Sequence, residues 1–221
     1  MDTPDRLDRA SSAFVRLYRL SGRPKDDVFA EMAVLDAIQA TDILDVSRPI
    51  EDRSGCWFSE VSLPPDNMAR VVGVFRPAKG IEPAGSLHDY QRIGQALADL
   101  HRQTHLAKIA QARNPGPGAG STTIALRSTA LAAAIAASAK LLEDKGATQH
   151  LGPVGFCHGD IRLSNLRISS EKMTLFDFDD CGIRPQLLDV AAIAFWLEVG
   201  KQHDSAGLWA AFLEGYGIKS G

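Results

Sequence analysis

The ten residues FCHGDIRLSN (156–165) decide the fold, because they place a histidine, an aspartate and an asparagine around a single glycine. His-Gly-Asp on its own is typical of a turn in which the aspartate accepts a hydrogen bond from a nearby backbone amide. Asn165 follows Asp160 by five residues, however, and the acidic cluster DFDD (177–180) follows Asn165 by twelve. Polar positions at these separations need a chemical reason beyond a turn.

Transfer of a phosphoryl group from ATP explains all three positions. The reaction asks little covalent chemistry of the protein, which holds the acceptor hydroxyl in line and neutralises the phosphate charge with Mg²⁺. One carboxylate orients or accepts the hydroxyl proton, while a second carboxylate and an amide oxygen hold the cation. Asp160 fits the first role, and Asn165 with Asp177 fits the second, at the D-x4-N spacing that kinase catalytic loops use.

Length and composition indicate a globular chain with a sizeable core. The 221 residues are 45% hydrophobic and carry a net charge of −3, with the basic residues scattered along the chain. We therefore expect neither nucleic acid nor a membrane as partner. The three cysteines form no metal-type pairs and are odd in number, which favours a reducing compartment. Together with the polar N-terminus, this predicts a cytoplasmic protein.

The first part of the chain predicts a small sheet with one helix. Apolar runs predict three strands, at 13–20, 56–63 and 70–76. A PPDN turn joins the last two strands as a hairpin. A helix is expected from Asp26 or Asp27 onward, with Glu31 beside its buried stripe. The stripe consists of Val28, Met32, Leu35 and Ile38.

A loop rich in proline and glycine, PAKGIEPAG, separates this part from a mainly helical remainder. We expect an N-lobe at 1–78 and a C-lobe at 79–221. A capping box at Ser86 and Asp89 predicts a helix that continues to His101. Two strands, PVGFC and MTLFDF, flank the HGD loop. The other expected segments are a linker at 114–123 and helices at 124–143, 187–199 and 206–216.

Several segments in order resemble the aminoglycoside phosphotransferase, choline kinase and homoserine kinase-like family, whose fold is similar to that of protein kinases. HGDIRLSN followed by DFDD is the centre of this resemblance. The other segments are FVRLYR, FAEMAVLDAI, VVGVFRPAKG, YQRIGQALADLH and LLDVA. The resemblance covers roughly residues 13 to 217, and ordered agreement of several segments is far more specific than one loop.

The resemblance implies an α+β, two-lobed fold like that of protein kinases and ATP- and Mg²⁺-dependent phosphorylation of a hydroxyl group on a small metabolite or antibiotic. Asp160 would position or deprotonate the hydroxyl. Asn165 and Asp177 would hold Mg²⁺, because three carboxylates within four residues repel one another unless a cation is near. Asp179 is a second candidate for binding the metal or the substrate. His158 would orient the catalytic loop without exchanging a proton in the reaction.

The resemblance also assigns residues outside the catalytic loop. Arg16 would pair with the phosphates and Glu31 with Arg16; arginine is able to bind phosphate through two parallel hydrogen bonds. The adenine would pack between the lobes against the backbone from Phe75 to Ala78. Asp189, at the start of an apolar helix, would anchor the backbone of the catalytic loop.

The sequence departs from the family in two places. Members begin with a hairpin whose glycine-bearing turn covers the phosphates, and nothing before Ala13 resembles it, so we expect a reduced N-lobe. Members also extend beyond the GYG segment near Tyr216. A pseudokinase-type nucleotide-binding or regulatory module, a protein Ser/Thr kinase and a fragment of a longer chain therefore all stay open. The acceptor and the oligomeric state do not follow from the sequence.

Two other motifs imitate known sites. HRQTH (101–105) puts two histidines one helical turn apart but lacks the glutamate of zinc proteases. GPGAGSTT resembles a phosphate-binding loop but has no lysine before its Ser-Thr pair and follows no predicted strand. We expect the first not to be a zinc site and the second to be a linker.

Overall fold

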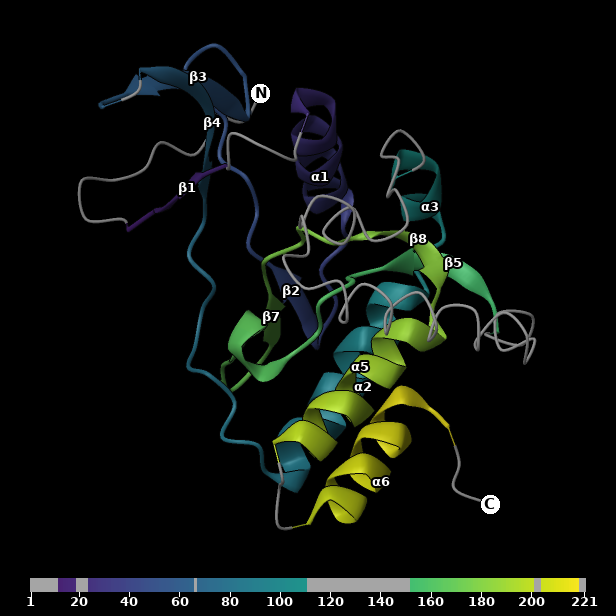
Figure 1. Ribbon diagram of the computed structural model, residues 1–221. Helices are drawn as coiled ribbons and strands as arrows, with labels where there is room; N and C mark the ends of the chain where they lie inside the picture. The colour runs from purple at the N-terminus through teal and green to yellow at the C-terminus, as the bar shows by residue number, and fades with distance from the viewer. Residues whose placement is uncertain (1–11, 19–23, 66, 111–151, 201–203, 219–221) are drawn as a thin grey trace, which may run out of the picture.

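Strands gather in the upper part of the molecule and helices in the lower part, as Figure 1 shows for the computed structural model of the chain. The structure describes residues 12–18, 24–65, 67–110, 152–200 and 204–218. Across these ranges no helix combines the length and the apolar character that crossing a bilayer requires.

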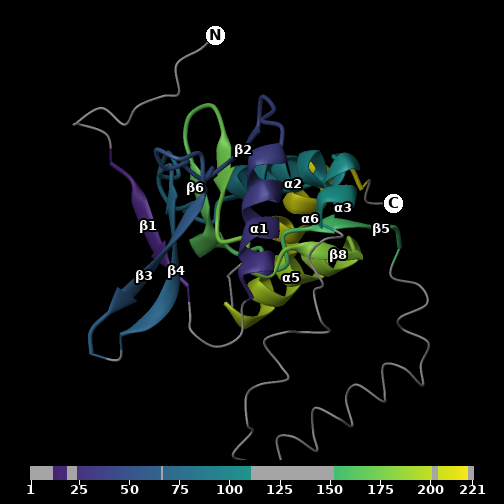
Figure 2. The same ribbon diagram turned by 90° about the horizontal axis from the view of Figure 1, so that it is seen from above.

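The upper part is a three-stranded antiparallel sheet with one helix beside it. Strand β4 (Met68–Phe75) is central, between β1 (Phe14–Leu17) and β3 (Phe58–Leu63). Helix α1 (Lys25–Ala37) lies beside this sheet, on the side that faces the helical part (Figure 2). The apolar stripe predicted for α1 is buried at Val28, Met32, Leu35 and Ile38.

A second three-stranded sheet connects the two parts of the molecule. Strand β2 (Leu44–Val46) comes from the N-terminal part and runs parallel to β7 (Met173–Leu175), which pairs antiparallel with β6 (Leu166–Ile168). A two-stranded sheet follows from β5 (Val154–Cys157) and β8 (Gly182–Pro185). Strand β5 ends at the HGD loop and β7 ends just before the DFDD cluster, so these short sheets fix where both segments begin.

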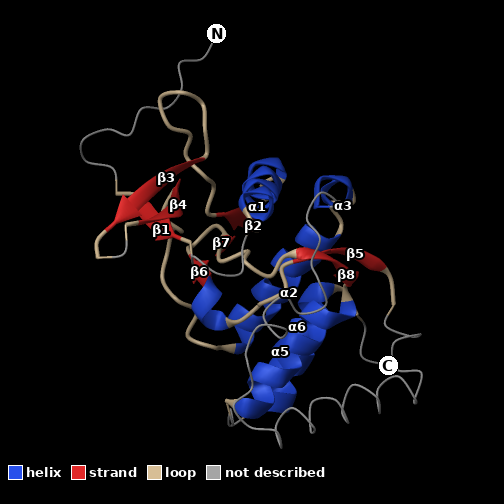
Figure 3. Cartoon of the chain, turned by 45° about the horizontal axis from the view of Figure 1, so that its top comes forward, coloured by secondary structure: helices blue, strands red, loops and turns tan. Residues whose placement is uncertain are grey.

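Helices build the lower part, where α2 (Leu87–His101) and α6 (Ser205–Tyr216) lie side by side (Figure 3). Helix α5 (Leu187–Val199) packs on α6, and the short α3 (His105–Ala110) contacts α1 beside it. One continuous apolar core passes through both parts of the molecule. The HGD loop is therefore supported by packed side chains, and Phe156 and Ile161, on either side of it, belong to this core.

The sequence predicted the long elements and some of the short strands, but it missed several other short elements. The capping box of α2 is confirmed: Asp89 N donates to Ser86 Oγ over 3.1 Å, and Ser86 N donates to Asp89 Oδ2 over 3.0 Å. The hairpin of β3 and β4 is also confirmed. The sequence did not predict β2, β6, β8 or α3, because three to six residues carry too little periodicity.

Some predictions fall outside the described residues or are not tested by the fold. The linker at 114–123, the helix at 124–143 and the region before Ser12, where the family's hairpin was sought, lie outside the described residues. The lobe boundary at residue 78 stays a prediction. Strand MTLFDF is shorter than expected, because it ends at Leu175.

The close packing of α2 on α6 gives a first prediction. A Cβ atom on Gly94 would overlap the carbonyl oxygen of Phe212, and one on Gly215 would overlap that of Gln91. Gly94→Ala should therefore lower the free energy of unfolding by about 2–4 kcal/mol, although alanine normally favours a helix. Urea unfolding measures it. Ala191→Gly, at an exposed position of α5, is the control for helix propensity alone.

An increase in stability on Gly94→Ala would contradict this packing.

Candidate active site

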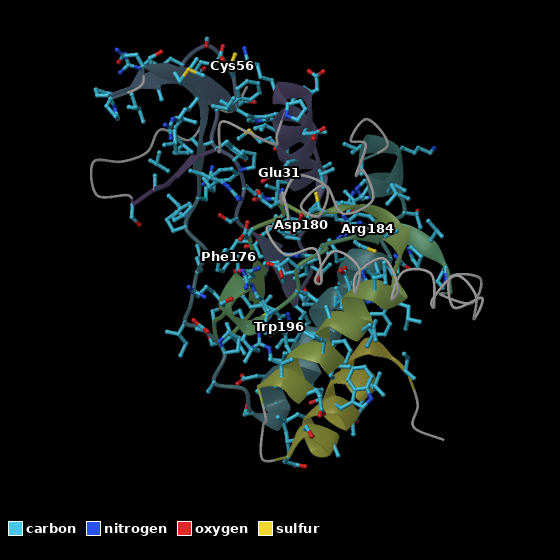
Figure 4. The ribbon with its side chains drawn as sticks, viewed as in Figure 1. Glu31, Cys56, Phe176, Asp180, Arg184 and Trp196 are labelled. Carbon is cyan, nitrogen blue, oxygen red and sulfur yellow. The ribbon has the colours of Figure 1, made fainter. Side chains whose placement is uncertain are left out.

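A cavity of about 500 Å³ opens between the upper sheet and the loop that follows β7. Five residues that the sequence assigned to the nucleotide and the metal line it together: Arg16, Glu31, Phe75, Ala78 and Asp177. They come from β1, α1, the end of β4 and the loop after β7. In Figure 4, Glu31 and Phe176 lie on either side of this region, and Cys56 lies at the far end of the upper sheet. The size is within the range of small-molecule sites.

Arg16 is the central charge of the cavity. Its guanidinium nitrogens lie 3.6 Å from Glu31, 3.1 Å from Asp177 and 2.5 Å from Asp179. Burial alone would lower the pKa of Arg16, but the carboxylates of Asp179, Glu31 and Asp177 outweigh it and raise the pKa. One cation therefore holds together the α1 carboxylate and the two carboxylates assigned to the metal.

Glu31 is almost fully buried, at 1% exposure, and has a second partner. Tyr18 donates its hydroxyl to Glu31 Oε1 over 3.2 Å, and the guanidinium of Arg16 lies 5.0 Å from the centre of the Tyr18 ring. Burial and the Glu31 charge both raise the pKa of Tyr18, so its hydroxyl stays protonated and donates. This network fixes the direction in which Arg16 points.

Asp177 has an unusual backbone. Its φ of 64° is in the left-handed region, which a residue other than glycine adopts mainly at turns and functional sites. Its Oδ1 atom is buried and is close to Arg16 only as an ion pair, without hydrogen-bond geometry. A buried carboxylate oxygen of this kind suits a hard cation. The donor set of Asp177, Asp179 and Asn165 thus fits Mg²⁺.

Asn165 and Asp160 are oriented by each other. Asn165 Nδ2 donates to the backbone oxygen of Asp160 and to its Oδ2, each over 2.9 Å. Both amide hydrogens are thereby used, and the Oδ1 oxygen of Asn165 is left to act as a ligand. Among the described residues no contact is recorded for Oδ1 of Asp160. The arrangement can present one oxygen to a metal and another to an acceptor.

His158 connects the catalytic loop to the DFDD segment. It is fully buried; Nδ1 accepts from Asp160 N over 3.3 Å and Nε2 donates to Phe176 O over 3.1 Å. Burial lowers the pKa of His158 against the opposing effect of Asp189, so the ring is neutral. With both nitrogens engaged inside the protein, the ring is placed to support the loop and not to exchange protons.

Asp189 lies beneath the same loop. Its carboxylate accepts from His158 N over 2.7 Å, from Gly159 N over 2.9 Å and from His101 Nε2 over 3.0 Å. Burial alone would raise the pKa of Asp189, but the hydrogen bond from His101, together with the nearby histidines and backbone amides, lowers it. The geometry agrees with the anchoring role that the resemblance implies, and that role stays a proposal.

His101 is a supporting residue that the sequence analysis missed. The HRQTH motif drew attention to a metal pair, but His101 faces Asp189 and Tyr216, whose hydroxyl lies 2.7 Å from Nδ1, while His105 bonds the backbone oxygen of Ala37. Asp189 could have indicated such a residue, because a carboxylate in an apolar helix needs hydrogen-bond donors nearby.

A second cluster resembles a metal site. Possible ligand atoms of His101, Cys157 and Asp189 lie within 4.8 Å of one another. Burial raises the pKa of Cys157 well above its usual range, so the thiol stays protonated, and both histidine nitrogens are already hydrogen-bonded. His101 and Asp189 are hydrogen-bonded to each other, and the Cys157 thiol lies near backbone oxygens of β5 and β8.

Gly159 brings the two loops of the site into direct contact. Its φ is 89°, and a Cβ atom there would overlap the backbone oxygen of Asp180. Any other residue would be strained by its conformation and would also push the two loops apart. The glycine in HGD therefore sets the distance between Asp160 and the DFDD cluster.

The segment expected to contact adenine offers one backbone donor. Arg76 N already donates to Arg48 O over 2.8 Å, and Pro77 has no N–H group. Ala78 N has no recorded partner among the described residues. Adenine was predicted to contact the backbone somewhere from Phe75 to Ala78. Among residues 76–78, the Ala78 amide is the donor that remains for this contact.

The fold and the cavity define a two-lobed protein with a nucleotide-sized site between sheet and helices. The profile of the phosphotransferase enzyme family matches residues 5–220, so the chain belongs to that family, as the residues predicted. No curated protein matches the chain.

Solved structures similar to this chain include three kinases or phosphotransferases. An amicoumacin kinase in complex with AMP-PNP and Ca²⁺ is 19% identical, with a TM-score of 0.73 over 95% of this chain and 66% of its own. A microcompartment-associated aminopropanol kinase is 22% identical, with a TM-score of 0.65 over 95% of this chain and 70% of its own. An AMP-bound spectinomycin phosphotransferase is 17% identical, with a TM-score of 0.56 over 96% of this chain and 72% of its own. These likenesses confirm the kinase-like fold, and the chain spans about two thirds of the first relative.

The neutral state of His158 predicts how stability depends on pH. Because its pKa is lowered in the folded state, the unfolded chain binds this proton more readily, and stability falls as pH decreases below about 6.5. His158→Gln removes that contribution, so its free energy of unfolding should change less between pH 7.5 and 5.5 than that of the parent. Urea unfolding at both pH values measures it.

The exposed His88 provides the matched control, since His88→Gln should keep the parent's pH dependence. Identical pH dependence in the parent and His158→Gln would show that His158 does not resist protonation in the fold.

Proposed function

We propose that the chain transfers the γ-phosphoryl group of ATP to a hydroxyl group of a small molecule, with Mg²⁺ as the cation. The observation that carries the proposal is the ion pair of Arg16 and Asp177, which both line a nucleotide-sized cavity. Asp160 and Asn165 are hydrogen-bonded to each other on the HGD loop, which touches the DFDD segment at Gly159. The printed names of similar structures support it, since they are kinases or phosphotransferases of amicoumacin, aminopropanol and spectinomycin, two of them with bound nucleotide or analogue.

In this proposal the loop residues divide the work between acceptor and donor. Asp160 Oδ1 accepts the hydrogen bond of the acceptor hydroxyl and takes its proton as the new bond forms. Asn165 Oδ1 and the carboxylates of Asp177 and Asp179 hold Mg²⁺. When bound, the cation neutralises charge on the phosphate oxygens. Arg16 pairs with the phosphates, and Glu31 keeps its guanidinium in place.

The remaining assignments concern support and nucleotide recognition. The adenine is placed against Phe75, with the Ala78 amide as its backbone donor. His158 and Asp189 hold the catalytic loop. ATP as donor and cysteines that form no disulfide with one another favour a cytoplasmic location.

Asp160→Asn should lower kcat at least about 100-fold and leave the affinity for ADP within about threefold. The variant keeps the shape of the side chain and a partner for Asn165, but an amide does not accept the hydroxyl proton. Single-turnover transfer and calorimetry with ADP measure the two quantities. Equal transfer by variant and parent would remove Asp160 from the mechanism.

Asp177→Asn should weaken Mg²⁺-dependent nucleotide binding about tenfold or more, because a neutral amide is a poor ligand for a hard dication. Asparagine tolerates the left-handed backbone at this position, so the fold should persist. Calorimetry with ADP, with and without Mg²⁺, tests it, and Asp36→Asn on the exposed side of α1 is the charge-matched control. Unchanged Mg²⁺ dependence would move the metal away from Asp177.

If the parent binds nucleotide but phosphorylates no acceptor, the pseudokinase alternative replaces the proposed activity.

A further inference from the structure

Arg162 is a charged residue of the catalytic loop to which the proposed mechanism gives no role. It lies two positions after Asp160, and its Nε atom is 3.2 Å from Asp160 Oδ2. The distance is that of an ion pair, but the alignment does not make a hydrogen bond. The guanidinium therefore lies against the candidate base without using its donors on it.

The outer edge of this guanidinium is open. Among the described residues no partner is recorded for its Nη atoms, and the side chain is 39% exposed. Arginine binds carboxylates best through two parallel N–H groups, and the Nη edge offers such a pair. A cation held beside the base, with its paired donors unused, is suited to bind an anion.

Trp196 supplies the second part of this surface. It comes from α5, its side chain is partly exposed, and the guanidinium carbon of Arg162 lies 5.8 Å from the centre of its ring. In the view of Figure 4, Trp196 lies on the helical side of the molecule, with Phe176 and Asp180 between it and Glu31. Trp196 belongs to α5, whereas Arg16 belongs to β1 and Glu31 to α1. The Trp196 ring both steadies Arg162 and offers an apolar face.

The charges on the two sides of Asp160 differ. Toward the cavity, Arg16 faces the carboxylates of Glu31, Asp177 and Asp179, which suits phosphates with a cation. At Arg162 the one recorded carboxylate is Asp160 itself. An amine bound near the acceptor hydroxyl would be repelled by Arg162, whereas a carboxylate would be attracted.

We propose that the acceptor is a hydroxy acid whose carboxylate binds the Nη edge of Arg162 and whose carbon chain lies on Trp196. This inference rests on the proposed phosphotransferase function and names its substrate class. The hydroxyl oxygen bonds to the γ-phosphorus, the bond from that phosphorus to the β–γ bridging oxygen breaks, and the hydroxyl proton passes to Asp160. The products are ADP and a phosphorylated hydroxy acid.

The geometry also limits the length of the acceptor. A carboxylate on the Nη edge and a hydroxyl on Asp160 Oδ1 would each lie about 3 Å from its partner. The two partners belong to residues joined by an ion pair of 3.2 Å, so the carboxylate and the hydroxyl lie a short distance apart. Short hydroxy acids with the two groups a few carbons apart satisfy this distance.

The test compares matched acceptors. Straight-chain 3-, 4- and 5-hydroxy acids are assayed with their neutral amides and with amino alcohols of equal length, following ADP release and confirming the product by ³¹P NMR. The expected order of kcat/KM is acid, then amide, then amino alcohol. Arg162→Gln should lower kcat/KM for the acid about 10–100-fold and leave that for the amide within about threefold. Arg162→Lys should recover part of the loss.

Binding is measured separately, so that this inference and the proposed activity can fail independently. Calorimetry titrates each acid into protein saturated with ADP and Mg²⁺, with Arg53→Gln, an exposed arginine, as control. Binding that Arg162→Gln abolishes and Arg53→Gln keeps supports the inference even without turnover.

Two results would overturn the inference. One is an equal loss for acid, amide and acceptor-free ATP hydrolysis in Arg162→Gln, which would assign Arg162 to the transferred phosphoryl group. The other is no preference for acids in either turnover or binding.

Discussion

The site depends on one buried carboxylate, that of Asp189. A charge so deeply buried is strongly unfavourable unless hydrogen bonds replace its water. In this protein two backbone amides of the HGD loop and one histidine from α2 supply them. The HGD loop donates hydrogen bonds to the Asp189 carboxylate, and the same hydrogen bonds hold the loop in place. The position of Asp160 follows from the need to pair a charge on the first turn of α5.

At the cavity too, a buried charge is stabilised by groups of opposite charge, but here the buried charge is positive. There a largely buried cation, Arg16, collects carboxylates from α1 and from the loop after β7. Segments far apart in sequence are thus brought together by charge pairing as much as by apolar packing. The two centres are connected through His158, which reaches from Asp160 to the residue before Asp177.

The sequence predicted the elements that have a motif or a long periodic face, and it missed those defined by contacts between distant residues. Helix α2 had a capping box and a long periodic face, and the HGD and DFDD segments had a spacing with a chemical reason, so both were predicted. Strands of three or four residues have no periodicity to detect, and β2, β6 and β8 were missed for that reason. His101 and Arg162 were missed because their roles come from neighbours distant in sequence or from a position that the motif leaves variable. The roles of the site residues remain predictions.

The contact at Gly159 has a consequence for how such a protein can diversify. Two stretches of main chain touch at this point, with no side chain between them. Nearly every substitution of Gly159 is excluded, because its backbone conformation and the lack of space both disfavour a side chain. The walls beyond Asp160 are made of side chains with solvent on one side. New specificities in this architecture would therefore be acquired at the rim, while the reacting centre is inherited unchanged.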